Sequence, residues 1–225
     1  MPCSQQAPHE SVAGRAQRRP WGGPSAVTLC VASNNFCVTG LLLAHPCDMR
    51  VLAISGSLRS QSTNTILLRA VAELAPPELE VVLFQELHRI PPFNPDLEAE
   101  NSSGAVSRFR AALQESCAVL FSTPEYAHGV PGVLKNALDW VVGSGELSGK
   151  PVVMVNASSR GAHAQASLKE ILTTMDARLL DRAEVTIDLI GKSLTPAEIA
   201  QEPAFASALR ASLEIVGECC AQACR

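Results

Sequence analysis

The hydrophobic positions of this chain form short uninterrupted runs from residue 50 onward, separated by segments with helical spacing. The apolar runs occupy residues 51–54, 119–121 and 152–155, and none of them alternates with polar residues. Strands that are buried on both faces have this pattern, which is typical of a parallel sheet covered by helices. Between the runs, apolar residues recur at the three- and four-residue intervals of amphipathic helices. The pattern therefore predicts an α/β domain in which strands and helices alternate.

Proline and glycine mark several boundaries of these elements. Pro76 and Pro77 end the first helix, Pro131 opens the third, and Gly143 follows the end of the third. The predicted strands are 50–55, 80–84, 118–122, 151–156 and a short fifth strand near 179–180 or 183–186, and the predicted helices are 63–74, 104–116, 131–142, 163–175 and 203–218. Together they predict a three-layer α/β domain with a five-stranded parallel sheet.

Residues 1–48 differ from the rest because they lack a sustained hydrophobic period. Met49 stands immediately before the first predicted strand. We predict that Met49 is the physiological start, that residues 1–48 are a disordered extension, and that one domain spans 49–225. An edge hairpin formed by residues 26–32 and 36–44 is the alternative.

Composition excludes several classes of function. A formal net charge of −4 and 4% aromatic residues provide neither bulk attraction for nucleic acid nor many platforms for stacking bases. No apolar stretch approaches the roughly 20 residues of a membrane-spanning helix, and the basic segment at residues 15–19 is not followed by the apolar core of a secretory signal.

The chain has eight cysteines, including Cys117 in the patterned region, but no paired C-x-x-C motifs. We therefore predict no metal site, and free thiols in a reducing cytoplasm.

The turn after the first predicted strand carries the most informative chemistry. Residues 56–64 read Gly-Ser-Leu-Arg-Ser-Gln-Ser-Thr-Asn and lead directly into a helix. Backbone N–H groups and the helix dipole attract anions at such a position. The turn matches neither the lysine-containing loop of nucleotide hydrolases nor the three-glycine dinucleotide fingerprint. Because four hydroxyl groups and Arg59 exceed the needs of one Ser/Thr helix cap, we favour a monophosphate site over a simple cap.

Two further loops are expected to face the same ligand. In an open parallel sheet, ligands bind at the carboxyl ends of the strands, near the point where the strand order reverses. The loops at 56–64, 124–129 and 158–163 would meet there. Their composition fits a flat ring, since Tyr126 can lie along an aromatic face. Taken alone, a surface aromatic on a loop is the simpler interpretation of Tyr126.

Two motifs resemble those of the NADPH-dependent FMN reductase family, which has a flavodoxin-like fold. They are residues 56–64 and residues 123–140, which read Thr-Pro-Glu-Tyr-Ala-His-Gly-Val-Pro-Gly-Val-Leu-Lys-Asn-Ala-Leu-Asp-Trp. The resemblance extends from residue 49 to about residue 185 and includes the loop at 90–96. It implies a flavodoxin-like sandwich with strand order 2-1-3-4-5, assembled as a homodimer or homotetramer. The helix from Leu134 to Trp140 would lie in the subunit interface.

The resemblance also implies FMN as a bound cofactor and NADPH, or NADH, as the hydride donor. By motif position, the phosphate would contact Ser57, Arg59, Ser62, Thr63 and Asn64, and the isoalloxazine ring would lie beside Pro124, Glu125, Tyr126, Ala127 and Ser158. The chain departs from the family at Ala127-His128-Gly129, where Asn-His-Ser is frequent, and at 158–163, where a glycine-rich loop is common. The second departure lies on the side of the site where the nicotinamide and the electron acceptor would bind.

The implied activity is that of an NAD(P)H-dependent flavoprotein oxidoreductase. It would pass a hydride to bound FMN and then electrons to a quinone, flavin, azo or oxyanion acceptor. Hydride transfer to a flavin requires no side-chain base, so we predict no catalytic residue. For His128 and Glu125, the residues allow either a role in proton transfer or a structural role. Arg160 could contact a phosphate of the nucleotide or simply lie on the solvated surface.

Two other functions compete with the reductase. A flavodoxin-like electron carrier would bind FMN without reacting with NAD(P)H, and a non-catalytic FMN-binding regulator would not turn over any acceptor. Carriers of this type are usually strongly acidic, so a net charge of only −4 disfavours the first alternative.

Overall fold

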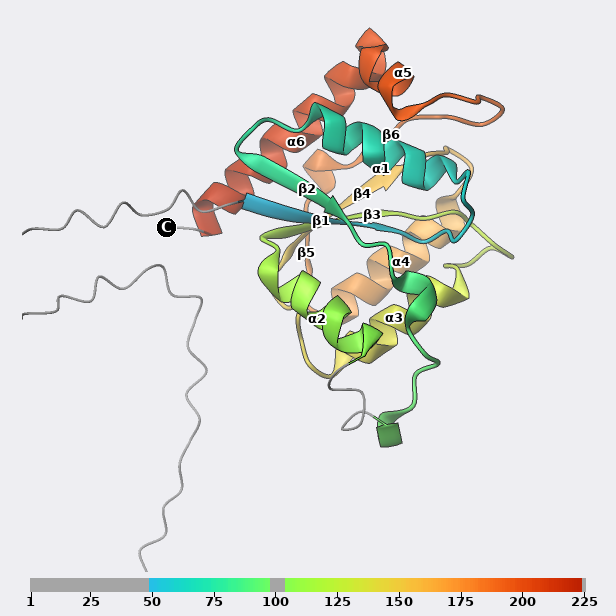
Figure 1. The fold of residues 1–225 in the computed structure, drawn as a ribbon, viewed down its shortest axis with the longest axis vertical. Coiled ribbons are helices and arrows are strands. Elements are labelled where there is room, and N and C mark those ends of the chain that lie inside the picture. The colour runs from blue at the N-terminus through green and yellow to red at the C-terminus, as the bar shows by residue number, and fades with distance from the viewer. Residues whose placement is uncertain (1–48, 98–103, 224–225) are drawn as a thin grey trace, which may run out of the picture. The chain divides into compact units, whose positions relative to one another are not determined.

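The computed structural model describes residues 49–97 and 104–223. The predictions made for residues 1–48, either a disordered extension ahead of Met49 or an edge hairpin, lie outside the described residues. Figure 1 shows a central sheet between two layers of helices, which confirms the predicted α/β architecture. No helix in the described part of the chain combines the length and apolar character that crossing a bilayer requires.

The sheet is parallel throughout. Its strands are β1 (Met49–Ser55), β2 (Leu79–Leu83), β3 (Ala118–Ser122), β4 (Pro151–Asn156), β5 (Arg178–Leu179) and β6 (Val185–Thr186). The order is β2-β1-β3-β4-β5, with β6 also paired to β4, so the expected order 2-1-3-4-5 is confirmed. Both positions proposed for the fifth strand are short strands, because β5 pairs with the start of β4 and β6 with its end.

Adjacent residues of each apolar run face opposite helical layers. One layer contains α1 (Thr63–Leu74), α5 (Pro196–Gln201) and α6 (Pro203–Ala223), and the other contains α2 (Ala105–Glu115), α3 (Gly132–Val142) and α4 (Ala162–Thr174). In β1, Val51 packs in the core of the first layer and Leu52 in the core of the second. A strand buried on both faces has no polar alternation, as the sequence pattern predicted.

The described residues also form short 3₁₀ helices, namely η1 (Leu87–Arg89), η2 (Pro95–Leu97) and η3 (Asp181–Ala183). Helix α5 was not predicted from the sequence. It begins with a capping box, in which the Thr195 side chain accepts a hydrogen bond from the Glu198 N–H and the Glu198 carboxylate accepts one from the Thr195 N–H. The Thr-Pro-x-Glu sequence at 195–198 is the signal that would have found this helix.

Cys117 and Cys220 form a disulfide, with their Cα atoms 5.4 Å apart. The prediction of free thiols is therefore wrong for this pair, although Cys219 is a free, buried thiol. Cys117 stands just before β3, and the end of α6 packs against the same face of the sheet. The two cysteines lie 103 positions apart, so no local spacing indicated the contact.

Trp140 is buried within its own chain, with only 1% of its surface exposed. Its indole Nε1 and the Asn136 Nδ2 both donate to the Pro91 carbonyl at 2.8 Å, and the Phe93 ring lies edge-on to the indole. The Trp140 side chain therefore does not pack against a second subunit, and the placement of the helix in an interface stays a prediction. The conspicuous Asn and Trp of the 123–140 motif instead fix the proline-rich loop after β2 against α3.

Candidate functional site

The turn at 56–64 lies at the carboxyl end of β1, against the loop that follows the neighbouring strand β3. The Gly56 N–H donates to the Ser122 carbonyl at 2.8 Å. A Cβ atom at position 56 would lie 2.5 Å from the Thr123 Oγ1, a distance that such contacts essentially never show. Glycine at this position therefore allows the two predicted ligand loops to touch.

The hydroxyl groups of this turn hold its shape. The Ser55 hydroxyl accepts bonds from the Ser57 N–H and the Thr65 hydroxyl, and the Ser57 hydroxyl accepts one from the Arg59 N–H. Ser62 is the N-cap of α1, because its side chain accepts a hydrogen bond from the Thr65 N–H. The simple cap interpretation is thus correct for Ser62, and it does not account for the hydroxyl groups of Ser60 and Thr63.

Several backbone N–H groups of the turn have no partner. Among the described residues, those of Ser60, Gln61, Thr63 and Asn64 donate no hydrogen bond. They lie at or just before the start of α1, where the positive end of the helix dipole is concentrated, and no acidic residue occupies the first turn of the helix. Unpaired N–H donors at the positive end of a helix dipole are suited to binding a phosphate group.

The side chain of Asn64 has a partner inside the protein. Asn64 is buried, and its Oδ1 accepts a hydrogen bond from the Ser122 hydroxyl at 3.0 Å. This bond joins the start of α1 to the end of β3. The group that Asn64 offers to a ligand is therefore its backbone N–H.

Two cavities adjoin the turn and share Leu58 and Arg59. The phosphate-side cavity, of about 230 Å³, is lined by polar groups that include Ser57, Arg59 and Arg69. The ring-side cavity, of about 370 Å³, is mostly apolar and is lined by Leu58, Tyr126 and the start of α3. Tyr126 is 52% exposed, so its ring is accessible to a flat ligand. Arg69 was not predicted as a site residue, and only its position four residues after Thr65 on α1 would have suggested it.

The loop after β3 makes a tight turn that presents Tyr126. The N–H groups of Tyr126 and Gly129 each donate to the other residue's carbonyl, at 3.2 and 3.0 Å. Between them, Ala127 and His128 have φ angles of 49° and 57°. This left-handed conformation is uncommon for residues other than glycine and favours Asn over Ala. The Ala127 that departs from the family pattern therefore occupies a position where the backbone is under strain.

Glu125 connects this loop to the next one. Its Oε2 accepts a hydrogen bond from the Ala164 N–H in the first turn of α4, at 2.9 Å. The carboxylate is thus a partner for the dipole of α4, which is one form of the structural role left open for Glu125. The imidazole rings of His128 and His163 are stacked with centroids 4.4 Å apart, which forms a second contact between the same two loops.

Ser158 lies apart from both cavities. Its hydroxyl accepts a hydrogen bond from the Arg160 N–H at 3.0 Å, and its carbonyl accepts one from the Gln165 side chain.

Of the predicted site residues, Ser57, Arg59 and Tyr126 line the two cavities, while the side chains of Ser62 and Asn64 support the turn. Thr63 is exposed beside the unpaired N–H groups, and Pro124, Glu125 and Ala127 belong to the loop that carries Tyr126.

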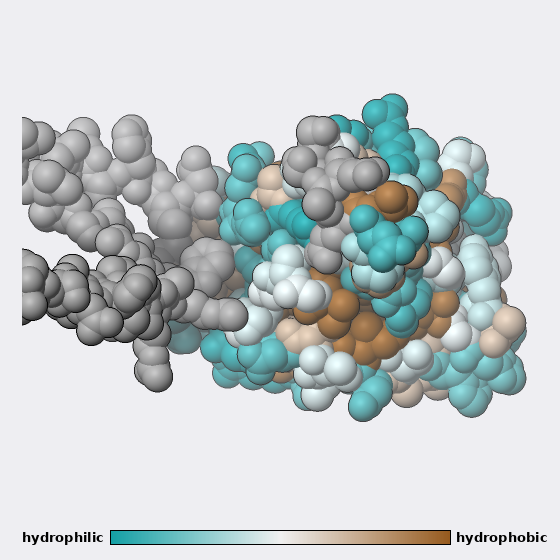
Figure 2. Space-filling view, turned by 90° about the horizontal axis from the view of Figure 1, so that it is seen from below, coloured by the Kyte–Doolittle hydropathy of each residue, from teal (hydrophilic) through white to brown (hydrophobic). Residues whose placement is uncertain are grey.

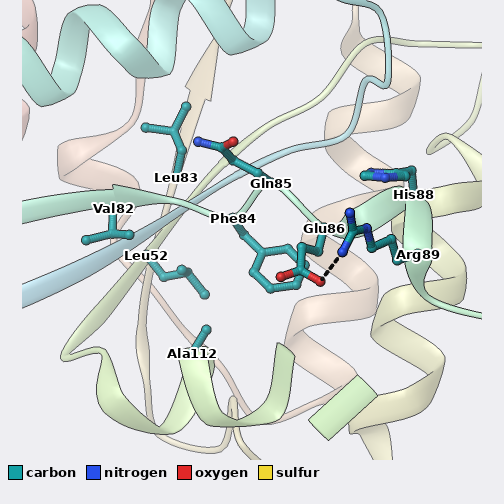
Figure 3. A pocket seen from close by; sticks show the side chains of 9 residues that line it. All are labelled: Leu52, Val82, Leu83, Phe84, Gln85, Glu86, His88, Arg89 and Ala112. Atoms are coloured by element: carbon teal, nitrogen blue, oxygen red, sulfur yellow. Dashed lines mark ion pairs between the residues drawn. The ribbon is translucent and has the colours of Figure 1, made fainter. Parts of the chain in front are cut away.

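A larger cavity, of about 460 Å³, lies on the other side of the chain that leaves β2 (Figure 3). We call it the β2–α2 cavity, because Val82 and Ala112 line it from these two elements. Its carboxylate, Glu86, forms ion pairs with Arg89 at 3.6 Å and Arg108 at 2.6 Å. The hydrogen bond from Arg108 is the main cause that lowers the pKa of Glu86 below its usual value. No predicted site residue lines this cavity.

Comparison with known proteins identifies the family of this chain. The sequence model of the family described as NADPH-dependent FMN reductase matches residues 49–191. An NAD(P)H-dependent FMN reductase of Pseudomonas aeruginosa is 41% identical over 145 residues, which cover 62% of this chain and 78% of the relative. A quinone reductase of Escherichia coli is 32% identical over 154 residues, covering 66% of this chain and 82% of the relative.

A solved structure supports the same assignment. FerB, a flavoenzyme NAD(P)H:(acceptor) oxidoreductase from Paracoccus denitrificans, superposes with a TM-score of 0.57 and 27% sequence identity, over 78% of this chain and 97% of FerB. The family match includes the turn at 56–64, the Tyr126 loop and the strands that bring them together. The chain therefore belongs to the NADPH-dependent FMN reductase family.

Proposed function

We propose that this protein is an NAD(P)H-dependent flavoprotein oxidoreductase that binds FMN across the phosphate-side and ring-side cavities. The observation that carries the proposal is the set of unpaired N–H groups at the start of α1, next to Arg59 and to an apolar cavity lined by Tyr126. The names of the two bacterial relatives support NAD(P)H as the donor and flavins or quinones as acceptor classes.

Some groups of the turn would bind the FMN phosphate directly, and others would hold the turn in shape. The Ser57 hydroxyl, the Arg59 guanidinium, the Thr63 hydroxyl and the free N–H groups of the turn would hold the phosphate, since charge-assisted hydrogen bonds are the strongest that a protein offers. Ser62 and Asn64 would act by fixing the turn and through the Asn64 N–H. When bound, FMN supplies the hydride and electron chemistry.

The Tyr126 loop would position the ring. Tyr126 would pack along the aromatic face, and Pro124, Glu125 and Ala127 would offer backbone groups to its edge. The Glu125 carboxylate, bound to α4, would keep this loop in place. Ser158 would act from the other edge through the loop that it shapes. We assign no catalytic acid or base.

The open ring-side cavity suggests how two substrates would use one site. Leu58 and Tyr126 are 53% and 52% exposed, so this cavity is accessible from solvent. The donor and the acceptor would therefore occupy the same place in turn, which predicts ping-pong kinetics. A quinone, flavin, azo compound or oxyanion would each fit this scheme.

We further propose that the protein forms a homodimer or homotetramer and works in the cytoplasm, where NAD(P)H is available. Figure 2 shows an apolar area bordered by hydrophilic residues on the side where α2 and α3 lie. Val142 at the end of α3 is 52% exposed, and Phe93 and Leu97 are each 38% exposed. Apolar surface of this kind is often covered by a second subunit.

The decisive experiment is rapid mixing of the FMN-loaded protein with NADPH or NADH in the absence of oxygen. We expect a yellow protein whose flavin absorbance bleaches quickly and returns when a quinone, flavin, azo dye or chromate is added. A protein that takes up no FMN would contradict the cofactor assignment. Bound flavin without bleaching would instead favour the electron carrier, and bleaching without turnover of any acceptor would favour the regulator.

A further inference from the structure

Arg69 lines the phosphate-side cavity together with Arg59, although it lies in the second turn of α1 and outside the 56–64 motif. It follows Thr65 by four residues, so both side chains lie on the same face of the helix. Side chains of a helix lean toward its N-terminus, which brings the guanidinium toward the phosphate turn. The cavity is thus lined by two arginines that come from different elements.

Neither of these guanidinium groups has a counter-charge in the described part of the chain. Arg50, Arg89 and Arg108 each form an ion pair with a glutamate, whereas Arg59 and Arg69 form none. No aspartate or glutamate lines the phosphate-side cavity, and none occupies the first turn of α1. Two unpaired positive charges beside unpaired N–H groups mark a place for an anion with more than one negative charge.

We propose that Arg69 is the second cation of the phosphate site and that the pair selects a dianionic phosphomonoester. This inference rests on the proposed binding of FMN and names a binding residue outside the motif. A phosphomonoester carries a charge of about −1.5 to −2 at pH 7. Arg59 alone would leave part of that charge unbalanced, and no lysine lines the cavity to balance the remainder. Arg69 supplies the second positive charge, so the site favours FMN over riboflavin, which lacks the phosphate.

The test compares the dissociation constants of FMN and riboflavin, measured by flavin fluorescence titration. The proteins are the wild type, Arg69→Gln, Arg69→Lys and the control Arg210→Gln, which removes an exposed helical arginine from α6. We expect Arg69→Gln to weaken FMN binding by about tenfold, the lower end of what a charge-assisted hydrogen bond contributes. Riboflavin binding should not change, Arg69→Lys should retain most of the FMN affinity, and Arg210→Gln should match the wild type.

The ratio of the two dissociation constants separates the possible failures. If the wild type binds FMN and Arg69→Gln keeps the same preference for FMN over riboflavin, the role of Arg69 is refuted while the proposed function stands. Equal weakening of both flavins would also refute it, because the substitution would then act through the fold. A wild type that binds neither flavin would overturn the proposed function itself.

Discussion

Two cavities flank the segment that leaves β2, and both are lined by Leu83, Phe84 and His88. The β2–α2 cavity has twice the volume of the phosphate-side cavity, about 460 against 230 Å³. Its carboxylate is paired with two arginines, whereas the arginines of the smaller cavity are unpaired within the described chain. The difference teaches that unsatisfied charge, rather than volume, is the better guide to where we propose that an anion binds.

The physical reason lies in what each cavity has left to offer. A charge that is already paired must lose its partner before it binds a ligand, so the gain is small. Free N–H groups and guanidinium groups form new charge-assisted bonds without breaking old ones. The comparison therefore predicts that changes around the smaller cavity affect FMN binding and that changes around the larger one do not.

The largest effect is expected from Gly56→Ala, which would break the smaller cavity itself. The new Cβ would lie 2.5 Å from the Thr123 Oγ1, and overpacking of this kind costs about 1–3 kcal/mol of unfolding free energy. FMN binding should be lost as well, because the phosphate turn and the Tyr126 loop would move apart. Denaturant unfolding and flavin titration measure the two effects.

Gly217→Ala in α6 is the matched control for this substitution. A Cβ there would meet nothing within 4 Å, and Ala is favoured over Gly in a helix by about 1 kcal/mol. The control should therefore be neutral or more stable and should bind FMN normally. A Gly56→Ala protein of wild-type stability would show that the loops can separate without cost.

A smaller effect is expected from Arg59→Gln, which leaves the cavity intact and removes one charge. Loss of a charge-assisted hydrogen bond should weaken FMN binding by about 2 kcal/mol, or roughly thirtyfold. Arg89→Gln, in the larger cavity, is the control and should change FMN affinity by less than a factor of about two. Equal losses in the two variants would abolish the distinction between the cavities.

The smallest effect is expected from Glu86→Gln, and it should appear in stability rather than in binding. The folded state lowers the pKa of Glu86, chiefly through the Arg108 hydrogen bond, so the carboxylate contributes stability that is present above its unfolded pKa of 4.5. That contribution is lost as the pH falls through the lower, folded pKa. Unfolding curves of wild type and variant should therefore differ at pH 7 and converge in acid, with FMN affinity equal at pH 7. A difference that persists unchanged at low pH would show that the ion pairs are not its cause.

Local sequence patterns predicted the elements that position the site. The predicted strand at 118–122 is β3 and the one at 151–156 is β4. A short run of apolar residues without polar alternation is typical of a strand that is buried on both faces. Helix α1 begins after Ser62 and ends before Pro76, where capping and proline chemistry placed its limits. The position of the turn at 56–64 could be predicted for the same reason, since it joins β1 directly to α1.

Contacts between distant segments could not be predicted in this way. The carboxylate of Glu125 accepts a hydrogen bond at the N-terminus of α4, and Cys117 forms a disulfide with Cys220. The Trp140 indole donates a hydrogen bond to the Pro91 carbonyl. Each pairing depends on how helices cross the sheet, which no local spacing encodes. Arg69, which we propose as a second phosphate contact, could not be predicted for a related reason, because the turn, the helix and the end of β2 must first enclose one cavity.

The bond from the Ala164 N–H to Glu125 has a consequence for how this enzyme would diverge. The loop at 158–163, where the chain departs from its family, leads directly into α4. Any remodelling of that loop that shifts the start of α4 would also pull on Glu125 and thereby displace Tyr126. New acceptor preferences are then expected to arise through paired substitutions in both loops, so that each step along an evolutionary path depends on the one before it.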